Sequence, residues 1–343
     1  MVDESHDYGR SGLQSRIAVP SHQCRLAPGV CLDTRHTQFG EPNNPTSGLI
    51  LFQRDYGPSQ PAVTHAVGSD RLANVDTRPV LRSGMETIRH HGRETAYRIS
   101  DHGASNPSMV CIHGSGGDHR IWAAQTRLAD TVPVVTMNLS GHGDSSELET
   151  QPGPETLDAY AADVAAVAHE TDARVLLGNS LGGAVAMQAI LDQRVSVDGL
   201  VLAGTGAKLG VSDRLLSWLD SDSALEQALE YLHESDRLFH DVTPEKRDQS
   251  WTTMAEVGRK VLRRDFRTCD RFDIRDRLQE LDVPAIAVVG ECDSLTPPSF
   301  HRYLASSLPA CDLHTIAAAA HLSMLERPIV FNRIVRQFVQ NLD

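Results

Sequence analysis

The sequence has no apolar run of the ~18–20 residues that a membrane-spanning helix needs. Its first residues, MVDESHDYGR, lack the basic stretch and the apolar core of a secretory signal. Six cysteines are scattered along the chain, with no CxxC pair and no cysteine–histidine spacing of the zinc-binding kind. These absences favour a cytoplasmic protein with reduced thiols and no membrane anchor.

Basic residues are also in short supply: 32 Lys and Arg face 45 Asp and Glu, for a net charge of −13. Nucleic-acid binding needs a basic patch, and docking on anionic lipid needs positive charge as well. We therefore expect neither a nucleic-acid partner nor a membrane partner. The adjacent pair His90 and His91 could indicate a metal. We favour a solvated strand edge there, and we predict no metal site.

The first 84 residues differ from the rest of the chain. They are rich in Pro, Ser, Asn, Gly and Arg and show no sustained period, apart from a short apolar patch at 49–52. This composition predicts a disordered or loosely attached segment. It is either a genuine extension or a start assigned too early, with Met85 as the true initiator. We favour the second explanation, because a clean strand pattern begins directly after Met85, and we place one domain at 85–343.

Strand and helix patterns alternate from Met85 onward. We predict two antiparallel strands within 86–100 and further strands at 108–112, 132–137, 174–177, 200–203, 285–289 and 310–316. Helices are predicted at 122–128, 156–169, 181–191 and 329–339. This alternation is typical of an α/β protein whose mostly parallel sheet is covered on both faces. Residues 211–277 lack strand signals and predict a helical lid, inserted after the sixth strand.

The strongest local signal is Gly178-Asn179-Ser180-Leu181-Gly182, which matches G-x-S-x-G between a predicted strand and a predicted helix. A serine on such a tight turn must adopt strained dihedral angles, and the residues two positions away must be small. The turn projects the hydroxyl above the sheet. The pattern therefore predicts Ser180 as a nucleophile.

A serine hydroxyl needs a base, and the base needs a carboxylate. His321 follows the last predicted strand and is the leading base. Asp293 follows the strand at 285–289, in G-E-C-D-S-L-T-P-P. Glu291 competes for the carboxylate role, but we prefer Asp293 because it lies at the apex of the turn. The order Ser180, Asp293, His321 is the one required by a hydrolase of this strand-turn-helix type.

Two backbone N–H groups are predicted to form the oxyanion hole, those of Leu181 and Ser115. Ser115 lies in the glycine-rich loop His113-Gly114-Ser115-Gly116-Gly117, directly after a strand. We expect His113 to buttress this loop rather than to act in catalysis. Trp122, which follows the loop, is expected to lie near enough to touch substrate.

Together these residues closely resemble the α/β-hydrolase superfamily, in its lid-bearing esterase and lipase-like branch. Four motifs match in order: H-G-S-G-G at 113–117, S-G-H-G-D-S at 140–145, G-N-S-L-G-G at 178–183, and the pair Asp293 and His321. The resemblance covers about 86–342. It implies an eight-stranded sheet and hydrolysis of a small molecule through an acyl-enzyme, with no cofactor and no metal. It leaves the oligomeric state open.

Two positions bear on specificity within that resemblance. Asn179 is reminiscent of hydrolases that cleave carbon–carbon bonds of ring-cleavage products, but it also occurs in plain esterases; we take it as a candidate substrate contact. Asn138-Leu139-Ser140 stands where relatives often have aspartate and arginine or proline, which implies altered salt bridging. In the lid, Arg267 could bind a substrate carboxylate, although we favour a surface salt bridge.

The leading interpretation is a hydrolase of a small or medium carboxylic ester. A second keeps the triad but makes the protein a carbon–carbon bond hydrolase or a cofactor-free haloperoxidase or perhydrolase. A third is a non-catalytic ligand-binding protein of the same fold. The presence of Ser180, Asp293 and His321 argues against the third.

Overall fold

The computed structural model describes residues 84–342. Eight strands form one sheet in the order β1-β2-β4-β3-β5-β6-β7-β8. The strands are β1 Glu86–His90, β2 Arg93–Ser100, β3 Ser108–Ile112, β4 Val134–Met137, β5 Ala173–Asn179, β6 Gly199–Ala203, β7 Ala285–Gly290 and β8 Cys311–Ile316. The first two pairings, β1 with β2 and β2 with β4, are antiparallel and the remaining ones are parallel. The predicted mostly parallel, eight-stranded sheet is confirmed.

Both faces of the central strands are buried, as their uninterrupted apolar sequences indicate. In β3, Val110 and Ile112 pack into the core on one face, while Met109 and Cys111 pack into the core on the other. All four side chains are completely buried. This two-sided burial follows from the period of two along a strand.

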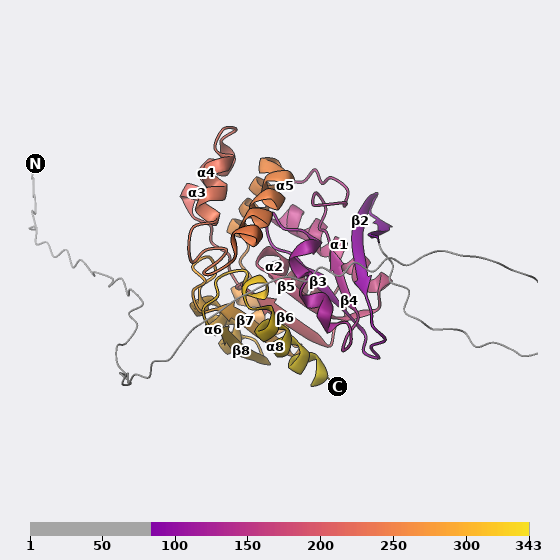
Figure 1. The fold of residues 1–343 in the computed structure, drawn as a ribbon. Helices are drawn as coiled ribbons and strands as arrows, with labels where there is room; N and C mark the ends of the chain where they lie inside the picture. Colours follow the sequence, from indigo (N-terminus) through magenta and orange to yellow (C-terminus); the bar gives the residue numbers. More distant parts are fainter. Residues whose placement is uncertain (1–83, 343) are drawn as a thin grey trace, which may run out of the picture. The chain divides into compact units, whose positions relative to one another are not determined.

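Helices cover each face of the sheet (Figure 1). One core contains residues of α1 (Pro154–Glu170), α2 (Leu181–Leu191) and α6 (Pro298–Ser307). The other contains residues of the short 3-10 helices η1 (His119–Trp122) and η2 (Gln125–Leu128) and of α8 (Pro328–Gln340). A one-turn helix, α7 (Ser323–Glu326), precedes α8.

The predicted helical lid lies between β6 and β7. It consists of α3 (Asp213–Asp220), α4 (Leu225–Leu232) and α5 (Pro244–Arg271), followed by the 3-10 helix η3 (Arg275–Glu280). The three α-helices gather at one end of the sheet (Figure 1). Helix α5 is kinked at Gly258, whose φ of 80° and ψ of 162° are not helical. The lid therefore interrupts the strand–helix alternation after the sixth strand, as predicted.

Two expectations differ from the structure, and a third group cannot be compared with it. The helix expected at 122–128 is two separate 3-10 turns, η1 and η2. Strand β4 begins at Val134, because Pro133 before it offers no N–H for a sheet hydrogen bond. The calls on residues 1–83, including disorder and the alternative start, lie outside the described residues. No helix within 84–342 is both long enough and apolar enough to cross a membrane.

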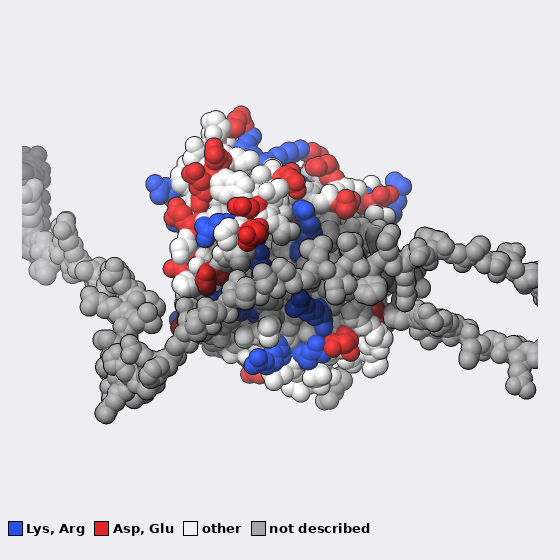
Figure 2. All heavy atoms as spheres, viewed as in Figure 1, with Lys and Arg blue, Asp and Glu red and all other residues white. Residues whose placement is uncertain are grey.

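Acidic and basic side chains are interspersed over the lid side of the described domain (Figure 2). Many of them pair. Arg263 and Arg267 of α5 both bind the carboxylate of Asp220 at the end of α3. The predicted surface salt bridge of Arg267 is thus confirmed, and its guanidinium is engaged within the lid itself.

Candidate active site

Ser180 occupies the sharp turn between β5 and α2. Its φ of 54° and ψ of −118° are rare for a residue with a side chain. A Cβ on Gly178 would lie 2.4 Å from the carbonyl oxygen of Gly182, and one on Gly182 would lie 2.3 Å from that of Ile112. The two glycines are therefore required for the chain to fold back on itself, as the motif predicts.

The backbone of Ser180 is fixed from both sides. Its N–H donates to the carbonyl of Ala203 at the end of β6, 3.0 Å away. Its own carbonyl accepts a hydrogen bond from the Thr205 hydroxyl at 2.8 Å. The side chain is half-buried and lines a cavity of about 830 Å³ under the lid. A strained residue so firmly held is a pre-organised one.

Asp293 and His321 are joined in the turns that follow β7 and β8. Nδ1 of His321 lies 3.0 Å from Oδ2 of Asp293, and both residues are buried. The other oxygen of Asp293, Oδ1, accepts the backbone N–H groups of Leu295 and Thr296, at 2.8 and 2.9 Å. The carboxylate is thus oriented by the turn around it, and it can hold the imidazole with its proton on Nδ1.

The electrostatics of Asp293 suit a carboxylate that stays ionised. Burial by itself raises its pKa. The charge and hydrogen bond of His321, together with the hydrogen bonds of Thr296, outweigh burial and hold the pKa below the usual range. Asp293 is therefore an anion at neutral pH and can stabilise an imidazolium next to it.

His321 and Ser180 line the same cavity. Gly204, which follows β6, lies close both to His321 and to Asn179, the residue directly before Ser180. A Cβ on Gly204 would be 3.2 Å from Nδ1 of His321 and 3.1 Å from Nδ2 of Asn179. Within residues 84–342 the Ser180 hydroxyl makes no hydrogen bond, to His321 or to another group. Such bonds are often long in unliganded hydrolases and shorten when substrate binds. The structure brings the three predicted residues together.

The predicted oxyanion-hole residues lie on either side of Ser180. Leu181 opens α2, where the first N–H groups have no carbonyl partner within the helix. Ser115 lines the cavity in the loop after β3, and its hydroxyl lies 3.5 Å from the sulfur of Cys269. A Cβ on Gly114 would be 3.0 Å from that of Ser180, so the loop passes directly beside the nucleophile. That the two amides bind an oxyanion remains a prediction.

Of the two predicted substrate contacts, one lines the cavity and the other does not. Asn179 lines the cavity but is only 1% exposed, and its Nδ2 donates to the carbonyl of Ala203 at 3.2 Å. Trp122 is completely buried, packs against Phe331 and does not line the cavity. The expectation that Trp122 touches substrate is therefore wrong in this structure. The 3-10 turn η1 directs its side chain into the core between the sheet and α8.

The structure supports the buttressing role of His113. It is completely buried; Nδ1 lies 2.9 Å from the carbonyl oxygen of Gly114, and Nε2 accepts the N–H of Leu139 at 3.0 Å. Burial, and secondly the neighbouring His142, lower its pKa to about 3. A histidine that stays neutral and has both nitrogens engaged in this way holds the loop in place.

Residues 109–334 match the model of the alpha/beta hydrolase family. The chain belongs to that family. It is accordingly a hydrolase.

Several characterised proteins are similar to this alpha/beta hydrolase. A pimeloyl-[acyl-carrier protein] methyl ester esterase of Neisseria meningitidis is 28% identical over 254 residues, which cover 68% of this chain and 94% of the relative. A 2-hydroxy-6-oxononadienedioate/2-hydroxy-6-oxononatrienedioate hydrolase of Burkholderia vietnamiensis is 26% identical over 270 residues, covering 73% and 92%. A solved thermophilic esterase has 27% identity and a TM-score of 0.66, covering 76% of this chain and 98% of the esterase.

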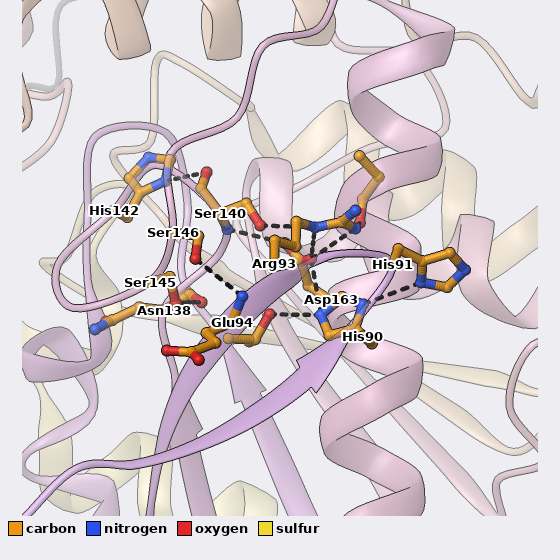
Figure 3. Close-up of polar contacts among 12 residues, drawn as sticks. His90, His91, Arg93, Glu94, Asn138, Ser140, His142, Ser145, Ser146 and Asp163 are labelled. Carbon is orange, nitrogen blue, oxygen red and sulfur yellow. Dashed lines mark hydrogen bonds and ion pairs between the residues drawn. The ribbon is translucent and has the colours of Figure 1, made fainter.

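The loop with the unusual Asn138-Leu139-Ser140 is held by an ion pair from elsewhere in this alpha/beta hydrolase. Asp163 of α1 accepts the N–H of Ser140 at 2.8 Å and Nε of Arg93 at 2.9 Å (Figure 3). Nε of Arg93 also donates to the Ser140 hydroxyl at 3.1 Å. This loop is thus held by an Arg93–Asp163 pair, while a difference from the salt bridging of relatives stays a prediction.

Figure 3 also places the adjacent histidines. His90 lies against the same buried carboxylate, 3.3 Å from Asp163, while His91 extends away from it. Nε2 of His90 also lies 2.7 Å from the hydroxyl of Thr95. His90 therefore belongs to the network that holds the loop, and of the pair only His91 is exposed, as expected for a solvated strand edge.

A second buried network was not predicted, and it ties the lid to the glycine-rich loop at 113–117, here called the oxyanion loop because it carries the predicted donor Ser115. Asp265 of α5 is completely buried. Its Oδ2 lies 2.9 Å from Nε2 of His142 and accepts the N–H of Gly116 at 3.2 Å, and its Oδ1 accepts the Tyr160 hydroxyl at 2.7 Å. The next residue, Arg264, donates to the carbonyl oxygens of Leu148 and Ser140 at 2.7 and 3.0 Å.

The sequence indicates some of these supporting residues better than others. Thr296, whose hydroxyl lies 2.8 Å from Oδ2 of Asp293, could have been found from its place three residues after the acid. Asp265 could not, because it sits among alternating charges in R-R-D-F-R, a pattern typical of an exposed helix.

Proposed function

We propose that this hydrolase cleaves a small or medium carboxylic ester, with Ser180 as nucleophile, His321 as base and Asp293 as the orienting carboxylate. The observation that carries the proposal is the strained turn at Ser180, whose serine lines the same cavity as His321, the partner of the buried Asp293. A cavity of about 830 Å³ is large enough for such a substrate.

The acylation step follows from the positions of the hydrogen-bonding atoms. With its Nδ1 proton donated to Asp293, His321 has an unprotonated Nε2. Nε2 takes the proton of the Ser180 hydroxyl while Oγ bonds to the ester carbonyl carbon. The carbonyl oxygen becomes an oxyanion, which accepts the N–H groups of Ser115 and Leu181. When the intermediate collapses, the C–O bond to the alcohol breaks and His321 returns its proton to the departing oxygen.

Deacylation repeats the same chemistry with water. His321 removes a proton from water as the water oxygen bonds to the acyl carbon. The bond to Oγ of Ser180 then breaks, and the serine recovers the proton from His321. The products are a carboxylic acid and an alcohol. Throughout, the negative charge of Asp293 stabilises the imidazolium that forms twice in each cycle.

The test is hydrolysis of p-nitrophenyl acetate and of a panel of short-chain esters by the wild-type protein and by Ser180→Ala. We expect the substitution to lower kcat by about 10⁴-fold or more, because the covalent intermediate can no longer form. Ser223→Ala, in the exposed turn between α3 and α4, is the control and should hydrolyse at the wild-type rate. Failure of the wild-type protein to turn over any ester of the panel would contradict the ester assignment.

A second candidate uses the same residues on a carbon–carbon bond. It is favoured by the similarity to the Burkholderia vietnamiensis hydrolase, which is named for 2-hydroxy-6-oxononadienedioate and 2-hydroxy-6-oxononatrienedioate. The two candidates separate when a fluorophosphonate probe is added. Labelling of Ser180 without ester turnover favours the carbon–carbon reaction. Absence of labelling in the folded protein favours a ligand-binding protein without catalysis.

We propose a small-molecule substrate and a cytoplasmic protein, with no nucleic-acid or membrane partner. The support is the net charge of −13, which repels polyanions and anionic lipid alike. The reaction as written needs no cofactor.

A further inference from the structure

Three side chains with metal-binding atoms converge beside the catalytic acid. Asp236 and His240 lie in the lid segment between α4 and α5, and Cys292 lies in the turn after β7, immediately before Asp293. One ligand atom of each residue lies within 4.8 Å of those of the other two. No local pattern indicates this group, because 52 positions separate His240 from Cys292.

The backbone on the lid side of the cluster is held in a fixed conformation. Asp236 has a φ of 64° and donates its N–H to the carbonyl of Phe239 at 2.9 Å. The N–H groups of His240 and Asp241 both donate to Oε1 of Glu326, at 2.8 and 2.7 Å. Ligands on a backbone so constrained lose little conformational entropy when they bind an ion.

The backbone on the other side is held as well. The N–H of Cys292 donates to the carbonyl of Ala319 at 2.9 Å. The N–H of Ser294 donates to the carbonyl of Asp236, also at 2.9 Å. This last bond joins the two segments directly, so that the three side chains are kept facing one another.

The chemistry of the donors selects the ion. A carboxylate, an imidazole and a thiolate are all ligands of Zn²⁺, whereas Ca²⁺ and Mg²⁺ prefer oxygen alone. With Zn–S near 2.3 Å and Zn–N near 2.0 Å, tetrahedral ligands lie roughly 3.5 Å apart. Nδ1 of His240 is already 2.5 Å from Oδ1 of Asp236, so only small side-chain rotations are needed.

We propose that Asp236, His240 and Cys292 form a Zn²⁺ site with a water molecule in the fourth position. Binding exchanges the proton of the Cys292 thiol for the metal, so one proton is released per ion bound. The ion would join the lid segment at 236–240 to the turn that carries Asp293. The site is separate from the ester chemistry, which requires no metal.

The experiment measures metal binding directly. The full-length protein, in a Cys24→Ser/Cys31→Ser background that removes the two N-terminal thiols, is stripped with a chelator and titrated with ZnCl₂ by calorimetry. We expect one ion per chain and a higher Tm in its presence. Titration with Co²⁺ should produce the near-ultraviolet absorption of a thiolate bound to cobalt, a signal independent of activity.

The substitutions Cys292→Ser, His240→Ala and Asp236→Asn should each weaken the affinity at least tenfold and abolish the Tm shift. Two of these side chains are partly exposed and His240 is exposed, and a surface ion pair such as Asp236–His240 contributes ~1 kcal/mol or less, so the metal-free variants should lie within about 4 °C of the parent Tm. Cys311→Ser and His91→Ala are matched controls, a second partly exposed thiol and the exposed histidine of the pair at 90–91. The proposal is overturned by absence of stoichiometric binding, by binding unchanged in Cys292→Ser, or by loss in His91→Ala.

Discussion

At the scale of single residues, the proposed reaction depends on a few atoms around Ser180. The serine is the one member of the site whose backbone conformation is itself costly, and its neighbours Gly178 and Gly182 make that conformation possible. Asp293 is fixed instead by hydrogen bonds from its own turn. Substitution of the glycines of this turn should therefore affect folding, whereas substitution of Asp293 should affect the rate of the proposed reaction.

A methyl group at Gly182 should disrupt the fold. In Gly182→Ala the new Cβ would lie 2.3 Å from the carbonyl oxygen of Ile112 and 2.6 Å from that of His113. Because these are backbone atoms, the clash cannot be relieved by a side-chain rotation, and we expect a loss of about 3 kcal/mol in the free energy of unfolding, measured in urea. Gly210→Ala, where nothing lies within 4 Å, should leave stability within ~0.5 kcal/mol. Equal stabilities of the two variants would contradict this reading.

The carboxylate assignment can be separated from its nearest competitor. Asp293→Asn keeps the shape of the side chain but removes the charge and favours the wrong tautomer of His321, so kcat for ester hydrolysis should fall about 10⁴-fold. Glu291 is exposed two residues earlier, and Glu291→Gln should keep the wild-type rate. The assignment is wrong if the two variants show the opposite pattern while both remain folded by circular dichroism.

At the scale of secondary-structure elements, success in prediction depended on how strongly local sequence dictates structure. Strands such as β3 and β7 are short apolar runs bounded by proline or glycine, and their positions were predicted to within a residue or two. The stretch after β3 was predicted less well. Its composition is compatible with an α-helix, but two 3-10 turns form there, and Trp122 consequently points into the core.

The helices of the lid were predicted, but its packing contacts were not. Its helical character follows from the absence of strand signals, and it was expected. The contact of Asp265 with the N–H of Gly116 depends on how α5 packs across a loop about 150 positions earlier, which local sequence does not encode. The proposed catalytic residues were easier to place, because each one follows a predicted strand and carries a side chain with its own chemistry.

Removing the charge of Asp265 should uncouple the lid from the oxyanion loop. In Asp265→Asn the bonds to Gly116 and His142 weaken, and the loop that carries Ser115 loses its anchor. Because oxyanion donors act in the transition state, kcat should fall on the order of 10-fold with little change in KM.

The control for this prediction is an acid on the exposed side of the lid. Asp220 accepts from Arg263 and Arg267 at the surface, and Asp220→Asn should change stability by less than ~1 kcal/mol and leave kcat unchanged. If both variants lose the same activity, the effect of Asp265 is general to the lid and does not pass through the oxyanion loop.

At the scale of the whole molecule, several buried histidines are kept neutral by the fold. His301 of α6 is completely buried, and its Nε2 accepts the N–H of Thr205 at 3.0 Å. Burial, partly opposed by the charge of Asp293, lowers its pKa to about 4. His113 is lowered further, to about 3. Unfolding releases both side chains to water, where a histidine pKa is about 6.5.

The consequence is a loss of stability in mild acid. Between pH 6.5 and pH 4 the unfolded chain binds a proton at His301 and the folded chain does not. The free energy of unfolding therefore falls as the pH is lowered through this window. One histidine contributes up to about 1.4 kcal/mol per pH unit, or on the order of 3 kcal/mol across the window.

The variant His301→Gln tests this origin of acid sensitivity. The Gln carbonyl can still accept the N–H of Thr205, but it does not titrate. Urea unfolding at several pH values between 4 and 7 should therefore give a shallower slope for the variant than for the wild-type protein, whatever its stability at pH 7. His314→Gln on β8, a histidine that is not buried, should leave the slope unchanged. Identical slopes for wild type and His301→Gln would show that protonation of other groups drives acid unfolding.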